Sequence, residues 1–284
     1  MKTKTTPQFY LDHGNWTDPR EHASAFDSVN KTVSAITSAV QGLLVHDYFG
    51  AHLYSEPPPN IASASRATLP IHARLPTLNA FGQTPLSAAR NTNLRAVGTC
   101  RDFALLTCSM LRHHVIPARV RCGFAHYFHP PTYEDHWICE YWDEETLSWK
   151  MADAQLDRAH VQHLSVTFDV NDMPVDQFVF AWKVWNACRN DFSLLKAFGH
   201  GEAKVFWFVR VNLVRDFLAL MKLEVSNWDT WREQADDDKE VSDAAIAQCE
   251  QIANASRLIE TTNDFDVGSL EALVEGLQSP HWHA

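Results

Sequence analysis

Apolar residues recur at three- and four-residue steps in two long parts of the chain, and this spacing predicts amphipathic helices. The first series covers residues 26–43 and predicts a helix that ends near Gly50. The second is the stretch "VFWFVRVNLVRDFLALMKLE", which starts at Val205 and predicts one long, largely buried helix. Two shorter helices are predicted near 241–260 and 268–277.

Alternation of apolar and polar residues predicts strands in the middle of the chain. The run "ARVRCGFAHYF" sets Ala118 and its apolar successors against Arg119 and Arg121, and "PPT" at Pro130 breaks it. The segments "DHWICEYW" and "LSWKMADAQ" are two further strand candidates, joined by the polar turn "DEET".

The last two strand candidates predict an antiparallel hairpin with a definite register. If Trp142 pairs with Leu147, the loop has an allowed hairpin length. The same register then places His136 directly opposite Asp153. Both side chains would lie on one face of the sheet, because residues alternate between faces along a strand.

A third helix is predicted directly after "VGTC". Thr99 is a suitable N-cap, and Asp102 stands three residues later, as in a capping box. Apolar residues then follow helical spacing until the chain reaches Pro117. Cys100 therefore occupies the first turn of a predicted helix.

The remaining segments predict the domain organisation. Residues 55–96 are rich in Pro, Ala and Thr and predict long irregular structure with one short helix, whereas "QADDDKE" at 234–240 predicts a linker. We expect a single domain over residues 1–235, with a core at about 95–157 and a helical elaboration at 158–235. Residues 236–284 are expected to form a helical C-terminal extension.

The charge of the chain narrows the classes of partner. A formal net charge of −11 without a basic cluster excludes a surface for nucleic acid or anionic membrane. No apolar run reaches the length of a membrane span, and the N-terminal stretch lacks the apolar core of a secretory signal. We therefore predict a cytoplasmic protein.

The cysteines and histidines do not predict a disulfide framework or a metal site. The six cysteines include no CxxC pair, so we expect free thiols. The histidines near the strands lack the short paired spacing of a zinc site, and no segment has the spacing of a calcium-binding loop. No phosphate-binding or dinucleotide-binding glycine pattern is present either, so we predict no metal and no cofactor.

Three residues could together carry nucleophilic chemistry. The N–H groups and the dipole at a helix start favour a thiolate at Cys100, and the same N–H groups can stabilise an oxyanion. A thiolate nucleophile needs an imidazole and a group that orients it, which the hairpin supplies in His136 and Asp153.

The segments "GTCRDFALL", "IPARVRCGF", "DHWICEYW" and "WKMADAQLD" occur in the order found in the transglutaminase-like superfamily, which the chain resembles over about 95–157. The resemblance implies a papain-like α+β fold, in which a Cys-bearing helix packs on an antiparallel sheet, here with additional N- and C-terminal helices. It implies Cys100 as nucleophile, His136 as base and Asp153 as orienting acid. The tail that begins at Val205 resembles uncharacterised bacterial members and indicates no substrate.

Two features depart from the pattern of that superfamily. Glu134 and Asp135 precede the histidine where a small or apolar residue is usual, so Asp135 could hold the imidazole in place of Asp153. Ala154 and Gln155 follow the acid where a turn containing proline is usual.

Several residues are weaker candidates for oxyanion or substrate contacts. Trp137, beside the histidine, could form a wall of a substrate cleft. Arg95 and Arg101 could bind a substrate carboxylate or pair with Asp102. The second oxyanion donor could come from any of three side-chain amides upstream of the cysteine, namely Gln83, Asn91 and Asn93.

We therefore predict a thiol hydrolase or acyltransferase that forms a thioester on Cys100 with a small-molecule or peptide amide substrate. Hydrolysis is favoured over amide formation with an amine acceptor, because water is always present. A non-catalytic relative that binds a peptide or partner in the same cleft is the alternative class. The C-terminal helices could also form a homo-oligomer interface.

Overall fold

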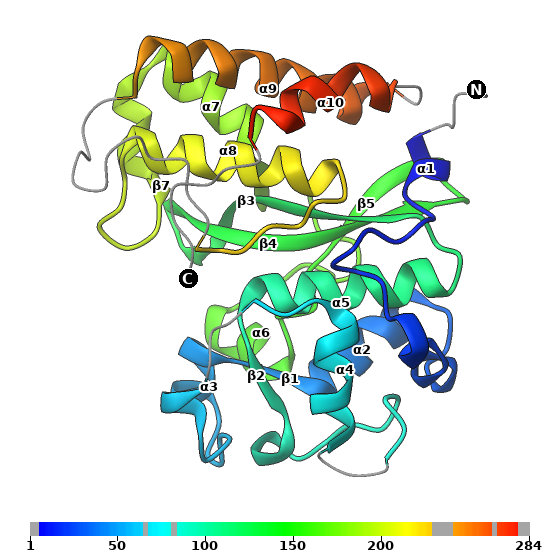
Figure 1. Ribbon diagram of the computed structural model, residues 1–284. Helices are drawn as coiled ribbons and strands as arrows, with labels where there is room; N and C mark the ends of the chain where they lie inside the picture. The colour runs from blue at the N-terminus through cyan, green and yellow to red at the C-terminus, as the bar shows by residue number, and fades with distance from the viewer. Residues whose placement is uncertain (1–5, 65–67, 81–83, 229–240, 263–265, 278–284) are drawn as a thin grey trace. The chain divides into compact units, whose positions relative to one another are not determined.

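The computed structural model describes residues 6–64, 68–80, 84–228, 241–262 and 266–277 (Figure 1). The chain forms two compact units, which we name after their central helices. The α5 unit comprises residues 10–120 and 138–174, and the α8 unit comprises the described residues before 10, from 121 to 137 and from 175 onward.

Short helices and strands surround one long helix in the α5 unit. Helices α2 and α4 pack against α5, and β1 pairs in parallel with β2, with Leu44 opposite Ala96. The elements of this unit are η1 (Arg20–Ser28), α2 (Val33–Leu43), β1 (Leu44–His46), α3 (Asp47–Leu53), η2 (Ile61–Ser63), α4 (Ile71–Ala80), η3 (Thr92–Leu94), β2 (Ala96–Gly98), α5 (Cys100–His113), β5 (Ser148–Ala152) and α6 (Arg158–Leu164).

Two long strands, β3 (Ala118–His129) and β4 (Thr132–Asp143), each have residues in both units. Within the α8 unit the strand order is β7-β4-β3-β6, with β3 antiparallel to β6 and β4 parallel to β7. The other elements of this unit are α1 (Thr6–Phe9), β6 (Phe178–Phe180), α7 (Ala181–Asn190), η4 (Phe192–Ala197), β7 (Phe198–Gly199), α8 (Phe206–Leu220), α9 (Asp243–Thr261) and α10 (Val267–Glu275).

Helix α8 forms the core of its unit, as the sequence predicts. Every residue from 208 to 220 is buried, and α7 and α9 pack against the helix. The helix also carries buried polar side chains, and Asp216 accepts two hydrogen bonds from Arg121 at 2.9 Å each. Asp216 further accepts the backbone N–H of Cys122, so this carboxylate joins α8 to β3.

Both arginines of β3 are fully buried, although their alternation with apolar residues would be typical of a strand with one solvated face. Each has a carboxylate partner, because a buried guanidinium without one would be strongly destabilising. Arg119 donates to Glu140 at 2.7 Å and stacks over the ring of Trp149, 4.1 Å from its centroid. Arg119 and Glu140 both belong to the α5 unit, whereas Arg121 and its partner Asp216 both belong to the α8 unit.

The first predicted helix is wrong in extent. The predicted helix over residues 26–43 is divided into η1 and α2, because Val29 is extended and Thr32 caps a new helix by accepting the N–H of Ala35 at 3.2 Å. Before Gly50, β1 intervenes and α3 begins. The predicted short helix within 55–96 corresponds to α4.

The predicted hairpin register is also wrong. Trp142 pairs with Trp149 rather than Leu147, and Cys139 pairs with Ala152. Leu147 instead lies in the turn with a positive φ of 49°. The register is therefore shifted by two residues, and its continuation places Asp153 opposite Ile138 instead of His136. A shift of two residues preserves the face of every side chain, since the period of a strand is two.

The architecture is α+β, in agreement with the predicted class. The proposed linker at 234–240 and the predicted domain boundary at residue 235 lie outside the described residues, so this division stays a prediction. The described helices beyond residue 240, α9 and α10, belong to the α8 unit, where α9 packs on α7 and α8. No helix of the described residues has both the length and the apolar character needed to span a membrane.

Candidate active site

Cys100 is the first residue of α5, after the extended N-cap Thr99. It is partly exposed, whereas the other five cysteines are buried and all six are free thiols. The unpaired N–H groups of the first helical turn favour negative charge near this position. The thiol of Cys100 is thus the accessible one, at a place that suits an anionic nucleophile.

The start of α5 is held by a buried carboxylate. Asp102 accepts the backbone N–H of Thr99 at 2.8 Å and forms an ion pair with Arg74 at 2.7 Å. Gly98 makes room for this carboxylate, because a Cβ there would lie 3.0 Å from Oδ2 of Asp102. The cap that the sequence predicts is therefore part of a rigid polar cluster directly beside the cysteine.

The buried cysteines are poor nucleophiles by comparison. Burial raises the pKa of the Cys188 and Cys249 thiols to about 11 each, and burial also raises the pKa of Cys139. A thiol with a raised pKa holds little thiolate at neutral pH. Their role is to fill the core.

Asp153 follows β5 in the α5 unit and is almost fully buried, at 1% exposure. Its side chain accepts the backbone N–H of Gln155 at 2.9 Å, and its own N–H donates to the carbonyl of Val170 at 2.9 Å. A proline at position 155 could not donate this hydrogen bond, so the departure from the usual proline turn has a structural counterpart. The carboxylate is held in one orientation.

His136 lies on β4 in the part of the strand that belongs to the α8 unit. The ring is 2% exposed and makes edge contacts with Phe128 and Tyr127, at centroid distances of 4.9 and 6.0 Å. This aromatic surround fixes the plane of the imidazole. The His136 ring therefore lies in an aromatic environment.

Asp135 pairs with His200, a histidine that sequence analysis did not select. The Nδ1 atom of His200 lies 2.5 Å from a carboxylate oxygen of Glu134 and 3.2 Å from one of Asp135. The parallel pairing of β7 with β4 sets Gly199 opposite Glu134 and so brings His200 to these carboxylates. The sequence "GHGEA" indicated only a turn there, and nothing in it indicated the contact.

These three residues are also the one group in the described part of the chain that gathers three metal-ligating atoms, all within 4.8 Å of one another. Hydrogen bonds from the imidazole to Asp135 and Glu134 raise the pKa of His200 to about 10. The histidine is thus a cation at neutral pH and offsets part of the negative charge of the two carboxylates. The three side chains therefore form an ion-pair cluster.

The weaker candidates occupy varied environments. Gln83 lies outside the described residues. Asn91 is exposed in a pocket of the α5 unit, and the carbonyl oxygen of the Asn93 amide is buried without a hydrogen-bond partner in the described structure. Trp137 is 1% exposed and its indole N–H likewise has no partner there. None of these positions identifies the second oxyanion donor.

The predicted pairing of Arg95 or Arg101 with Asp102 is wrong. Arg74, from α4, takes the place beside Asp102, because α4 packs directly on α5. Arg95 instead lies 3.4 Å from Asp157, and the Arg101 guanidinium stacks over Trp16 at 4.9 Å from the ring centroid. Both partners come from segments distant in sequence, which spacing alone does not reveal.

Residues 60–154 match the family model of the transglutaminase-like superfamily. A solved structure named as a "Putative Cysteine Protease", from Cytophaga hutchinsonii, aligns with 60% of this chain and 44% of its own at 19% identity, with a TM-score of 0.36. The alignment thus spans less than half of that protein. No curated protein matches the chain.

The matched segment contains α5 with Cys100 and both β4 and β5 with Asp153. Residues 60–154 are thus a transglutaminase-like core, which confirms the resemblance found in the sequence. Such a core supports an enzyme of the thiol-dependent type in general.

Proposed function

We propose that the protein is a cysteine-dependent acyl-transfer enzyme that acts on an amide or related acyl bond through a thioester on Cys100. One observation carries the proposal: Cys100, which begins α5 within the matched core, is partly exposed, whereas the other five cysteines of the chain are buried. A cysteine that served only as a small apolar residue of the core would be expected to be buried, since free cysteines are among the most buried residues.

The proposed reaction proceeds in two steps. The Cys100 thiolate attacks the acyl carbon, and N–H groups at the start of α5 stabilise the resulting oxyanion. The carbon–nitrogen bond breaks as protonated His136 gives its proton to the leaving amine. Neutral His136 then takes a proton from water, the hydroxide attacks the thioester, and the Cys100 thiolate is expelled.

We propose Asp153 as the residue that orients the His136 imidazole. Its carboxylate is buried and fixed by Gln155, whereas the carboxylate of Asp135 pairs with His200. This occupation of Asp135 favours Asp153 over Asp135 for the role. The mechanism requires the His136 ring to reach the Cys100 sulfur.

We favour hydrolysis over transfer to an amine. We also propose a cytoplasmic location, which suits six free thiols. The small-molecule or peptide nature of the amide substrate is also a proposal. Two outcomes distinguish the reaction types: release of a free acid in water, or formation of a new amide when methylamine is added.

The test uses p-nitrophenyl acetate, an activated acyl donor. The expected result is a burst of nitrophenolate with an acetyl group on Cys100, mapped by peptide mass spectrometry. Cys100→Ala abolishes the burst, and the matched variant Cys188→Ala, which removes a buried thiol, retains it. Acetylation spread evenly over the cysteines, or none at Cys100, would contradict the enzyme proposal and favour a non-catalytic binding protein.

A further inference from the structure

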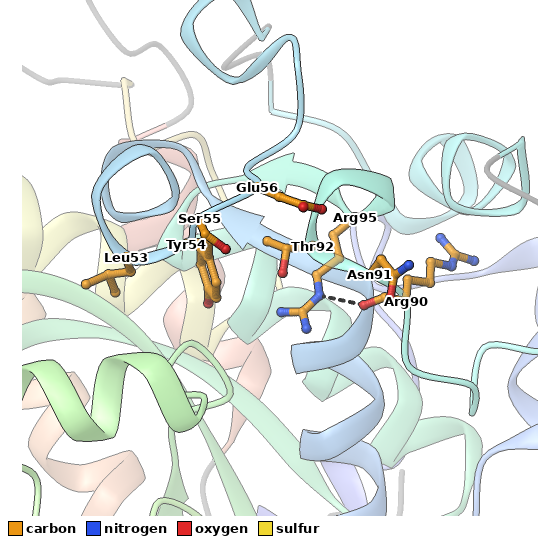
Figure 2. Close-up of a pocket in the computed structure, with 8 residues that line it drawn as sticks. All are labelled: Leu53, Tyr54, Ser55, Glu56, Arg90, Asn91, Thr92 and Arg95. Atoms are coloured by element: carbon orange, nitrogen blue, oxygen red, sulfur yellow. Dashed lines mark hydrogen bonds between the residues drawn. The ribbon is translucent and has the colours of Figure 1, made fainter.

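A polar pocket opens in the α5 unit between residues 53–56 and 90–95 (Figure 2). Its volume is about 490 Å³. The proposed mechanism assigns no role to the residues that line it, which are Leu53, Tyr54, Ser55, Glu56, Arg90, Asn91, Thr92 and Arg95.

No carboxylate or other hydrogen-bond acceptor of the described residues pairs with the Arg90 guanidinium. The residue is 7% exposed, and all three guanidinium nitrogens are buried without a hydrogen-bond partner among the described residues. Burial lowers the pKa of this guanidinium, in keeping with its lack of a counter-ion. A buried unpaired charge is strongly unfavourable, and an anion bound on the Arg95 side would offset it only in part, by attraction over a longer distance.

Arg95 is the cation that faces the pocket. In Figure 2 its side chain runs toward Tyr54, whereas the Arg90 guanidinium extends in the opposite direction. Nε of Arg95 donates to the carbonyl of Arg90 at 3.2 Å, and Nη1 lies 3.4 Å from Asp157. These contacts orient the guanidinium and leave Nη2 for a ligand.

Asp157 does not line the pocket but contacts two residues that do, Tyr54 and Arg95. Asp157 accepts hydrogen bonds from the Tyr54 hydroxyl at 2.5 Å and from Nδ1 of His160 at 2.9 Å. It also accepts backbone N–H groups of the first turn of α6. The negative charge of Asp157 is shared among these donors, and the contact of Asp157 with Arg95 is the longest of them. Arg95 therefore keeps positive charge available for a second anion.

We propose that this pocket binds the oxyanion group of a ligand, a carboxylate or a phosphate, with Arg95 as the direct partner and Arg90 as a more distant positive charge. Guanidinium groups suit both anions, which they bind through paired N–H groups. The Thr92 and Ser55 hydroxyls and the Asn91 amide offer further donors at the wall. Glu56 is exposed at this site. The inference goes beyond the proposed function and does not depend on Cys100.

The test is calorimetric titration of the full chain with sodium glutarate and with sodium phosphate, at constant ionic strength held with sodium chloride. We expect saturable binding of one of these anions, which identifies the source as carboxylate or phosphate. Arg95→Gln should weaken that binding at least about tenfold, because a charge-assisted contact is lost. Arg90→Gln should weaken it less, since only a more distant charge is removed.

Arg257→Gln is the matched control, because Arg257 is an exposed arginine of α9 that bonds Asn254 at 2.8 Å. It should bind the anion as the wild type does. If thermal unfolding shows that Arg95→Gln does not fold, Arg95→Lys replaces it and should still bind more weakly than wild type. Lack of saturable binding to both anions, or equal binding by wild type and the Arg95 variant, would overturn the proposal.

Discussion

Asp157 is a strongly stabilised carboxylate, and this predicts its behaviour with pH. Burial alone would raise its pKa, but hydrogen bonds from His160 and Tyr54 outweigh burial and lower the pKa from 3.8 to about 2. A carboxyl with a lowered native pKa stabilises the fold above its unfolded pKa. This stabilisation is lost as the pH falls through the native value.

Asp157→Asn should therefore lower the free energy of unfolding at pH 7 by about 2 kcal/mol. The difference from wild type should shrink as the pH falls from 3.8 toward about 2, the range over which the carboxyl is protonated. Urea unfolding at a series of pH values measures both effects. A difference that stays constant across this range would show that the carboxylate charge is not the stabilising feature.

Individual residues differed in how well the sequence identified them. The position of Cys100 at the start of a helix was predicted correctly, because a cap and a helix pattern coincide there. His200 could not be identified, because its carboxylate partners lie far away in the chain, and Arg90 could not, because spacing does not reveal which guanidinium is buried. Arg74 likewise took the partner that spacing assigned to Arg95 or Arg101.

The start of α5 depends on Asp102, which both caps the helix and pairs with Arg74. Asp102→Ala should destabilise the α5 unit by about 3–5 kcal/mol, because it leaves a buried guanidinium unpaired and removes a cap. Asp102→Asn keeps an acceptor for the N–H of Thr99 and should destabilise less. Chemical denaturation of the two variants compares them, and equal losses would assign the whole effect to the ion pair.

The contact between β7 and β4 carries its own pH dependence. His200 has a native pKa raised to about 10 by Asp135 and Glu134, against an ordinary value of 6.5. A raised pKa stabilises the fold fully below 6.5, and this stabilisation is lost as the pH rises through about 10. We expect His200→Ala to melt below wild type at pH 6 and to approach it near pH 10.

The melting temperatures of both proteins across this pH range provide the measurement. The effect should be small, because the His200 side chain is exposed to solvent. Glu134→Gln, which removes one of the two carboxylates, should show part of the same trend. A gap between wild type and His200→Ala that widens with rising pH would contradict the assignment.

The sequence predicted the positions of several helices well, because their apolar residues repeat regularly, but it did not predict the pairing of strands correctly. The patterns for α5, α8, α9 and α10 each extend over several turns, so their positions follow from sequence alone. The predicted register of β4 with β5 was wrong by two residues, because the turn has a positive φ at Leu147. A leucine rarely adopts a positive φ, so the sequence did not indicate this turn. The face of each side chain was unaffected.

The molecule as a whole consists of two compact units, each with its own buried ion pair on β3. Asp216→Ala removes the partner of Arg121 in the α8 unit, where both side chains are fully buried. We expect a loss of about 3–5 kcal/mol, since the remaining charge is unpaired. Hydrogen exchange should locate the loss in α8 and β3, and unchanged protection in both would contradict this role.

The central claim is that Cys100 is a reactive nucleophile supported by His136. Its most direct test is the rate of iodoacetamide labelling of each cysteine at neutral pH, followed by peptide mass spectrometry in wild type and in His136→Ala. We predict that Cys100 labels at least about tenfold faster than every other cysteine, and that His136→Ala removes most of this advantage while the protein stays folded. Labelling of Cys100 at the rate of an ordinary exposed thiol, unchanged by His136→Ala, would contradict the account.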